Sequence, residues 1–135
     1  MDRTRVLLRF SALFALIGVF IGSHMAGSGG YSLQPLHAHI LVVGWLSLFA
    51  FAAFYRLFSI SKDSKLANIQ VWTAIIGSIS LPTGMYWERM ITEGPLATVA
   101  LIYFIVGGTI LMISFILFFT MTFVFSNSIK EKSDY

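Results

Sequence analysis

The chain has 135 residues and a formal net charge of +3; 57% of its residues are hydrophobic and 11% are charged. A water-soluble domain of this size cannot bury so much apolar surface, so the composition excludes an ordinary soluble globular protein. The sequence contains no cysteine, which excludes disulfides, thiolate metal sites and iron–sulfur clusters. The positive charge is small and dispersed, and it gives no indication of nucleic-acid binding.

Four apolar segments follow one another along the chain, at about 6–25, 36–58, 69–91 and 96–125. Each is long enough for the roughly 20 residues that a helix needs to cross a bilayer. A Gly/Ser-rich link, a charged link and a Gly-Pro turn separate them. The first segment is longer than the apolar region of a secretory signal. The pattern therefore predicts an all-α integral membrane four-helix bundle, with a single transmembrane domain over residues 1–135.

The basic residues predict the orientation of this bundle, because Lys and Arg are retained on the cytoplasmic side during insertion. Only Arg89 falls on the other side of a four-span arrangement. The remaining basic residues share one side: Arg3, Arg5, Arg9, Arg56, Lys62, Lys65, Lys130 and Lys132. Both termini are therefore expected in the cytoplasm, and the three histidines are expected near the outer face of the membrane.

The histidines are the main candidates for chemistry, since ionisable groups within spans are costly and usually functional. His37 and His39 open the second span after Pro35, and His24 closes the first. Neutral imidazole is a good ligand for haem iron, zinc and copper. Residues two apart lie about 200° apart around a regular helix, so His37 and His39 should not chelate one ion together.

Two further residues extend the predicted site. Gly44 and Trp45 follow His37 at helical spacing, and Gly44 would leave a flat depression suited to a porphyrin edge. The alternative is that Gly44 only permits close helix packing. In the third span Pro82 should free the carbonyl of Ser78 and bend the helix, either beside a cavity or for packing.

The segment 34–58, with its His-Ala-His-x-x-x-x-Gly-Trp pattern, resembles the second helix of the catalytic subunit of haem–copper oxidases. It is most similar to the nitric oxide reductase large subunits and to small four-span bacterial proteins described as oxidase subunit I-like. This resemblance implies that His37 is an axial ligand of haem b, and that the chain lies in the bacterial inner membrane. A second comparison, with a His-x-His helix of the same oxidases, implies a haem role for His39.

The departures from that family limit the expected activity. An oxidase catalytic subunit has about twelve spans and further metal-binding histidines, whereas this chain has three histidines in all. It cannot form a dinuclear centre, so we do not expect it to act as an enzyme that reduces oxygen or nitric oxide alone. A second axial ligand would come from His24 or from a symmetric homo-oligomer, or the oligomer would bury the histidines in a shared interface.

Three functions remain open from the sequence. The first is a haem b protein for electron transfer, haem handling or gas sensing, with His37, His39, Gly44 and Trp45 at the cofactor and a respiratory-chain partner. Arg89 would pair with the haem propionates, or else with its acidic neighbours Glu88 and Glu93. The second is a haem-free membrane interaction or oxidase-accessory protein. The third binds or transports copper or zinc through His24, His37 and His39.

Overall fold

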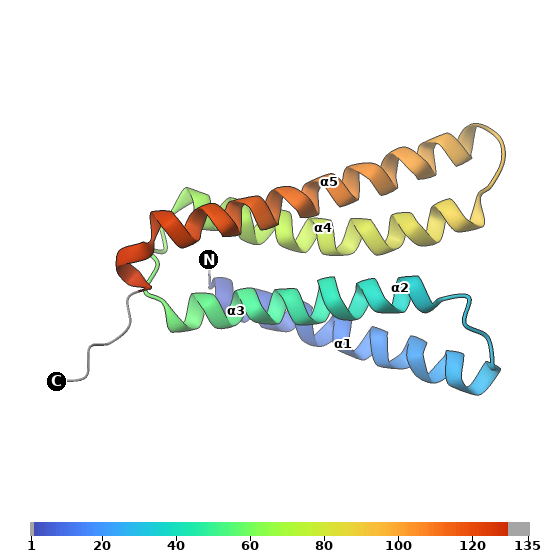
Figure 1. Ribbon diagram of the computed structural model, residues 1–135, viewed down its shortest axis with the longest axis horizontal. Helices are drawn as coiled ribbons and strands as arrows, with labels where there is room; N and C mark the ends of the chain where they lie inside the picture. Colours follow the sequence, from blue (N-terminus) through green and yellow to red (C-terminus); the bar gives the residue numbers. More distant parts are fainter. Residues whose placement is uncertain (1, 130–135) are drawn as a thin grey trace.

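The computed structural model describes residues 2–129, and this part of the chain is helical throughout, with no strand (Figure 1). The helices follow along the chain in this order: α1 (Arg3–Ser28), α2 (Gln34–His39), the π-helix η1 (Ile40–Ser47), α3 (Leu48–Leu57), α4 (Lys65–Met90), α5 (Pro95–Val124) and the short 3₁₀ helix η2 (Ser126–Ser128). Because α2, η1 and α3 follow one another without a break, the described part contains four long helical rods. The predicted all-α class is confirmed.

Three of these rods are long and apolar enough to cross a membrane: Arg3–Ser28, Gln34–Leu57 and Pro95–Val124. The fourth, α4, has the length of α1 but carries more polar residues, among them Asn68 and Gln70. The chain is thus a multi-pass membrane protein by the length and composition of three helices, while a crossing by α4 stays a prediction.

The helix ends follow from local sequence. The side chain of Asp2 accepts a hydrogen bond from the Arg5 amide at 3.0 Å and caps α1, and Ser64 caps α4 in the same way. Gly29 ends α1 in the left-handed region, with a φ of 67°, a conformation that costs glycine little. Pro95 stands in the first turn of α5, where its missing N–H is not needed.

Glycines bring the helices of each hairpin into close contact. In the hairpin of α4 and α5, a Cβ atom placed on Gly77 would lie 2.7 Å from the backbone of Leu111. In the hairpin formed by α1 with the α2–α3 rod, Gly18 and Gly22 lie four residues apart and face that rod. Small residues at this spacing allow helices to approach closely in membranes. The fold therefore consists of two helical hairpins, and their apolar contact includes Leu7, Leu48 and Ile75.

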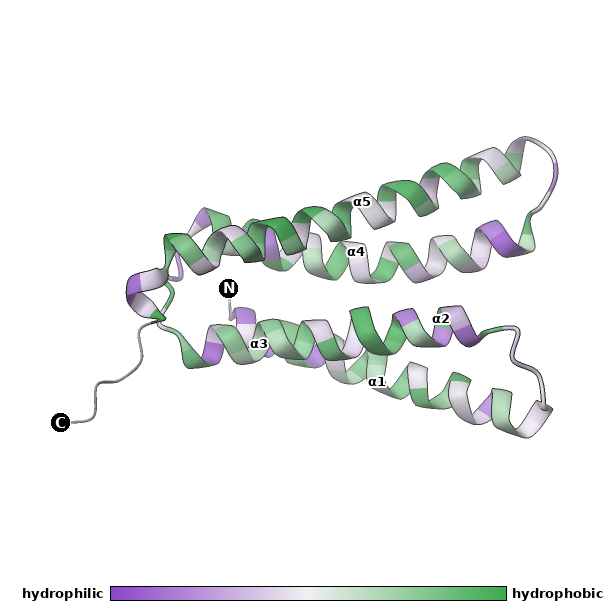
Figure 2. Cartoon of the chain, in the orientation of Figure 1, coloured by the Kyte–Doolittle hydropathy of each residue, from purple (hydrophilic) through white to green (hydrophobic). Residues whose placement is uncertain are grey.

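The two ends of the bundle differ in their side chains. We call the end that holds the start of α1 and the α3–α4 link the arginine end, because Arg3, Arg5, Arg9 and Arg56 lie there (Figures 1 and 2). We call the other end, with the α1–α2 and α4–α5 links, the histidine end; it holds His24, His37, His39 and Arg89. The predicted separation of charge is visible here, except that Lys130 and Lys132 lie outside the described residues.

A polar cluster joins the hairpins near the arginine end. The guanidinium of the buried Arg3 donates to Asn68 Oδ1 at 2.9 Å and to the carbonyl oxygens of Ser61, Lys62 and Ser64 at 3.0, 2.8 and 3.2 Å. Its charge also lies over the ring of Tyr55, 5.5 Å from the centroid. These contacts tie the start of α1 to the link before α4.

Candidate functional site

His37 is held against α1 by a hydrogen bond to the backbone. Its Nδ1 atom lies 2.9 Å from the carbonyl oxygen of Gly18. One turn further along α1, a Cβ atom at Gly22 would lie 2.9 Å from Cε1 of the same ring. The imidazole therefore lies over the surface formed by two glycines, and it is partly buried there.

This hydrogen bond fixes the tautomer of His37. A carbonyl oxygen can only accept, so Nδ1 carries a proton, and in the neutral ring Nε2 carries the lone pair. Nε2 has no hydrogen-bond partner among residues 2–129. Every buried side-chain nitrogen or oxygen in that range has such a partner, so Nε2 is not buried. Nε2 is therefore accessible from outside the chain. Histidines that ligate metals commonly have this arrangement, with the second nitrogen bonded to a carbonyl.

Among residues 2–129, the three histidines do not form one metal-binding group. Nδ1 of His39 lies 2.8 Å from the carbonyl oxygen of Pro35, within its own helix, while His24 is exposed near the end of α1. Among residues 2–129 no three His, Asp or Glu side chains form a group that could hold a metal ion. The structure thus does not assemble the copper or zinc site that the sequence left open for His24, His37 and His39.

The helix below His37 is not an α-helix, which the sequence analysis did not foresee. Residues 40–47 form a π-helix, whose wider i→i+5 turn changes the direction of each side chain. Gly44 nevertheless lies on the side of the rod that His37 occupies, because both residues contact α1. Gly44 is buried against Phe14 of α1, and Trp45 is 44% exposed. The predicted depression at Gly44 is wrong, because the Phe14 ring fills that space.

Three serines satisfy carbonyl groups of the π-helix. Ser11 of α1 donates to the carbonyl of Trp45 at 3.0 Å, and Ser78 of α4 donates to that of Val43 at 3.3 Å. Ser47 donates to the carbonyl of Val42 at 2.8 Å. The sequence offered one sign of these bonds, which is the presence of serines in otherwise apolar segments. Each polar group within a membrane needs a partner, so such serines indicate backbone groups that need a hydrogen bond.

The chain matches no protein-family model, no curated protein and no solved structure. The site must therefore be interpreted from its own chemistry. Within residues 2–129, Nε2 has no partner in either His37 or His39, and His37 is the one of the two whose Nδ1 is held by a carbonyl of a neighbouring helix.

Arg89 lies at the same end of the bundle as His37. It is exposed on the last turn of α4, and it lines a cavity of about 380 Å³ together with Pro35 and Leu36 of α2. No carboxylate pairs with Arg89 among the described residues, although Glu88 is its neighbour in the chain. The simpler pairing expected from the sequence is not formed, although Glu88 lines the same cavity as Arg89.

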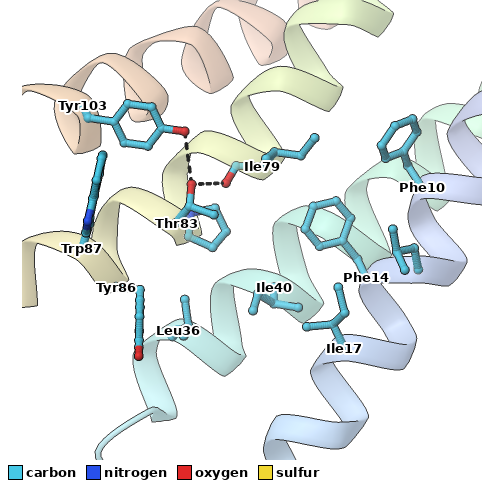
Figure 3. A pocket seen from close by; sticks show the side chains of 12 residues that line it. Phe10, Phe14, Ile17, Leu36, Ile40, Ile79, Thr83, Tyr86, Trp87 and Tyr103 are labelled. Carbon is cyan, nitrogen blue, oxygen red and sulfur yellow. Dashed lines mark hydrogen bonds between the residues drawn. The ribbon is translucent and has the colours of Figure 1, made fainter. Parts of the chain in front are cut away.

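A larger apolar groove of about 800 Å³ separates the hairpins towards the histidine end (Figure 3). Leu36 and Ile40 line it from the second rod, and Phe14 lines it from α1. Pro82 lines it from α4, so this proline borders a cavity. Among the polar lining groups, Thr83 donates to the carbonyl of Ile79 at 2.7 Å and lies 3.3 Å from the hydroxyl of Tyr103. His37 faces α1 and does not line this groove.

Proposed function

We propose that the chain is an integral membrane protein that binds b-type haem through Nε2 of His37. The observation that carries this proposal is the 2.9 Å contact between His37 Nδ1 and the Gly18 carbonyl oxygen, which leaves Nε2 as a lone-pair donor. The donor set fits one axial position of a haem iron. The resemblance of residues 34–58 to an oxidase helix points to the same histidine.

Haem, when bound, supplies one-electron redox or gas-binding chemistry. Arg89 supports the assignment, because a cation without a carboxylate partner at the same end of the bundle can pair with a propionate. Among residues 2–129 no metal-binding group of three His, Asp or Glu side chains includes His37. The second axial position would be open, which suits gas sensing, or would be filled by His24 or by a second copy of the chain, which suits electron transfer.

The same proposal includes a four-span topology with both termini in the cytoplasm. Its support is the difference between the ends: the arginine end carries the basic residues of α1, α3 and the α3–α4 link, whereas Arg89 stands alone at the histidine end. The side that retains Lys and Arg is the cytoplasmic one. His37 would then lie near the outer face of the membrane.

The test is the visible difference spectrum of the purified full chain, with a pyridine haemochrome assay to count haem per chain. We expect a b-type signal near one haem per site in the native protein and its loss in His37→Ala. His39→Ala is the matched control, because its imidazole bonds only to its own helix, and it should keep the haem. Haem retained at full stoichiometry by His37→Ala would refute the assignment.

A second pair of variants tests the position of the ring without removing it. Gly22→Leu should displace the imidazole, since even a Cβ atom there would lie 2.9 Å from Cε1, whereas the space around Gly27 is open and Gly27→Leu should have no effect. We expect haem loss in the first variant only.

The rival function is a haem-free interaction protein, and one observation favours it: the contact of His37 with Gly18 is by itself a helix-packing hydrogen bond. Protein that stays colourless after expression with ample haem, yet loses its oligomers in His39→Ala, would establish this rival instead.

A further inference from the structure

Three arginines converge on one groove at the arginine end of the molecule. Arg5 and Arg9 lie one turn apart on α1, Arg56 lies in the last turn of α3, and all three line a groove of about 530 Å³. Each of them is exposed. This groove lies at the end of the bundle opposite to His37, so nothing in it depends on haem binding.

The positive charge in this groove is only partly compensated. Asp2 also lines it, and one of its carboxylate oxygens lies 3.4 Å from Nε of Arg5. Arg9 and Arg56 have no ion pair and donate no side-chain hydrogen bond among residues 2–129, whereas the guanidinium of Arg3 is fully engaged with backbone carbonyls and Asn68. Among residues 2–129, two guanidinium groups that line this groove therefore have no carboxylate partner.

The groove continues from these charges onto an apolar surface. Leu8 and Ala12 of α1 line it, Leu8 is 41% exposed, and Leu16, one turn beyond Ala12, is 69% exposed. Leu8, Ala12 and Leu16 form a row along α1, which is long and apolar enough to span the membrane. This row therefore leads from the membrane surface into the hydrocarbon region. The groove thus offers cations at one end and an apolar track at the other.

We propose that this groove binds one anionic phospholipid, with its phosphate between Arg9 and Arg56 and an acyl chain along Ala12 and Leu16. Guanidinium groups form bidentate hydrogen bonds to phosphate oxygens, and basic pockets between membrane helices bind the head groups of acidic lipids. A soluble anion lacks the acyl chain, and a zwitterionic lipid carries a cation that the arginines repel, so each should bind more weakly than an anionic phospholipid.

Native mass spectrometry of the full chain in detergent tests the proposal, with phosphatidylglycerol, phosphatidylcholine and inorganic phosphate as probes. We expect one tightly held phosphatidylglycerol per chain and weaker retention of the other two. Each arginine near the surface contributes roughly fivefold to binding, so R9Q/R56Q should weaken phosphatidylglycerol binding by roughly 25-fold.

The variant K62Q/K65Q removes two positive charges from the same end, but neither lysine lines the groove. It should change phosphatidylglycerol binding less than about twofold, because exposed charges outside a binding site contribute little. Ala12→Phe fills the track without changing charge and should also weaken the lipid. Equal losses in the arginine and lysine variants would overturn the proposal in favour of diffuse attraction. Inorganic phosphate that binds as tightly as the lipid would overturn the phospholipid assignment.

Discussion

Phe14 of α1 lies directly against Gly44 of the π-helix: a Cβ atom on the glycine would overlap Cγ and Cδ1 of the ring. The phenylalanine is 8% exposed, so it has little room to move away. This contact fixes how closely α1 approaches the second rod beside His37, and it explains why the glycine is needed without reference to a porphyrin.

Because of this contact, the cost of a substitution at Gly44 should depend on the side chain at position 14. Gly44→Ala should destabilise the protein by about 1–3 kcal/mol, because it inserts a methyl group into filled space. In a Phe14→Ala background the same change should cost much less. Detergent-to-SDS unfolding titrations of the four proteins measure this coupling. Equal costs in both backgrounds would show that the ring does not limit the space at Gly44.

The hairpin of α4 and α5 offers a comparison of two glycines. A Cβ atom on Gly77 would lie 2.7 Å from backbone atoms of Leu111, whereas one on Gly108 would meet only Cδ1 of Leu81 at 3.5 Å. Gly77→Ala should therefore lower the unfolding free energy by about 1–3 kcal/mol, and Gly108→Ala should leave it within about 0.5 kcal/mol of the native value. The same SDS titration serves as the measurement, and a reversed order would contradict the packing described.

A buried hydrogen-bond chain joins three rods near the arginine end. The hydroxyl of Tyr55 donates to Gln70 Oε1 at 2.8 Å, and Gln70 Nε2 donates to Ser114 Oγ at 3.3 Å. Tyr55→Phe leaves the amide oxygen of a fully buried glutamine without this donor, so we expect a loss of about 1 kcal/mol. Tyr103→Phe, at an exposed hydroxyl, is the control. A Tyr55→Phe protein as stable as the control would show that Gln70 finds another partner.

Substitution of Arg3 should loosen the link before α4 rather than destabilise the whole protein. Its guanidinium bonds to the carbonyls of Ser61, Lys62 and Ser64, so Arg3→Gln should release that link. Loss of these charge-assisted hydrogen bonds should lower the free energy of local opening by about 1.4 kcal/mol. Amide hydrogen exchange in the link before α4 should therefore become at least about tenfold faster. Arg5→Gln, whose partner is the exposed Asp2, should leave this exchange unchanged.

Sequence periodicity predicted the helical class and the helix positions, because long apolar runs in a bilayer have few alternatives. It also placed His37 and His39 apart. It also placed Gly44 on the side of His37, and both residues contact α1, but it did not foresee that residues 40–47 form a wider turn. Whether Ser11 and Ser78 bond to their own helices or to the π-helix depends on which helices are neighbours. That information is tertiary, and local sequence does not contain it.

The distribution of bonds between the hairpins has a mechanical consequence. Hydrogen bonds join them at Asn68, Gln70 and Ser78 of α4, and among residues 2–129 no side-chain hydrogen bond joins them beyond Ser78, where the apolar groove begins. α4 ends at Met90, 12 residues beyond Ser78, so its unbonded part is about 18 Å long at about 1.5 Å per residue. A tilt of about 3° about Ser78 then displaces the far end by about 1 Å. Small rotations at the arginine end are thus amplified at the histidine end, where the distance between the hairpins can change without breaking a bond.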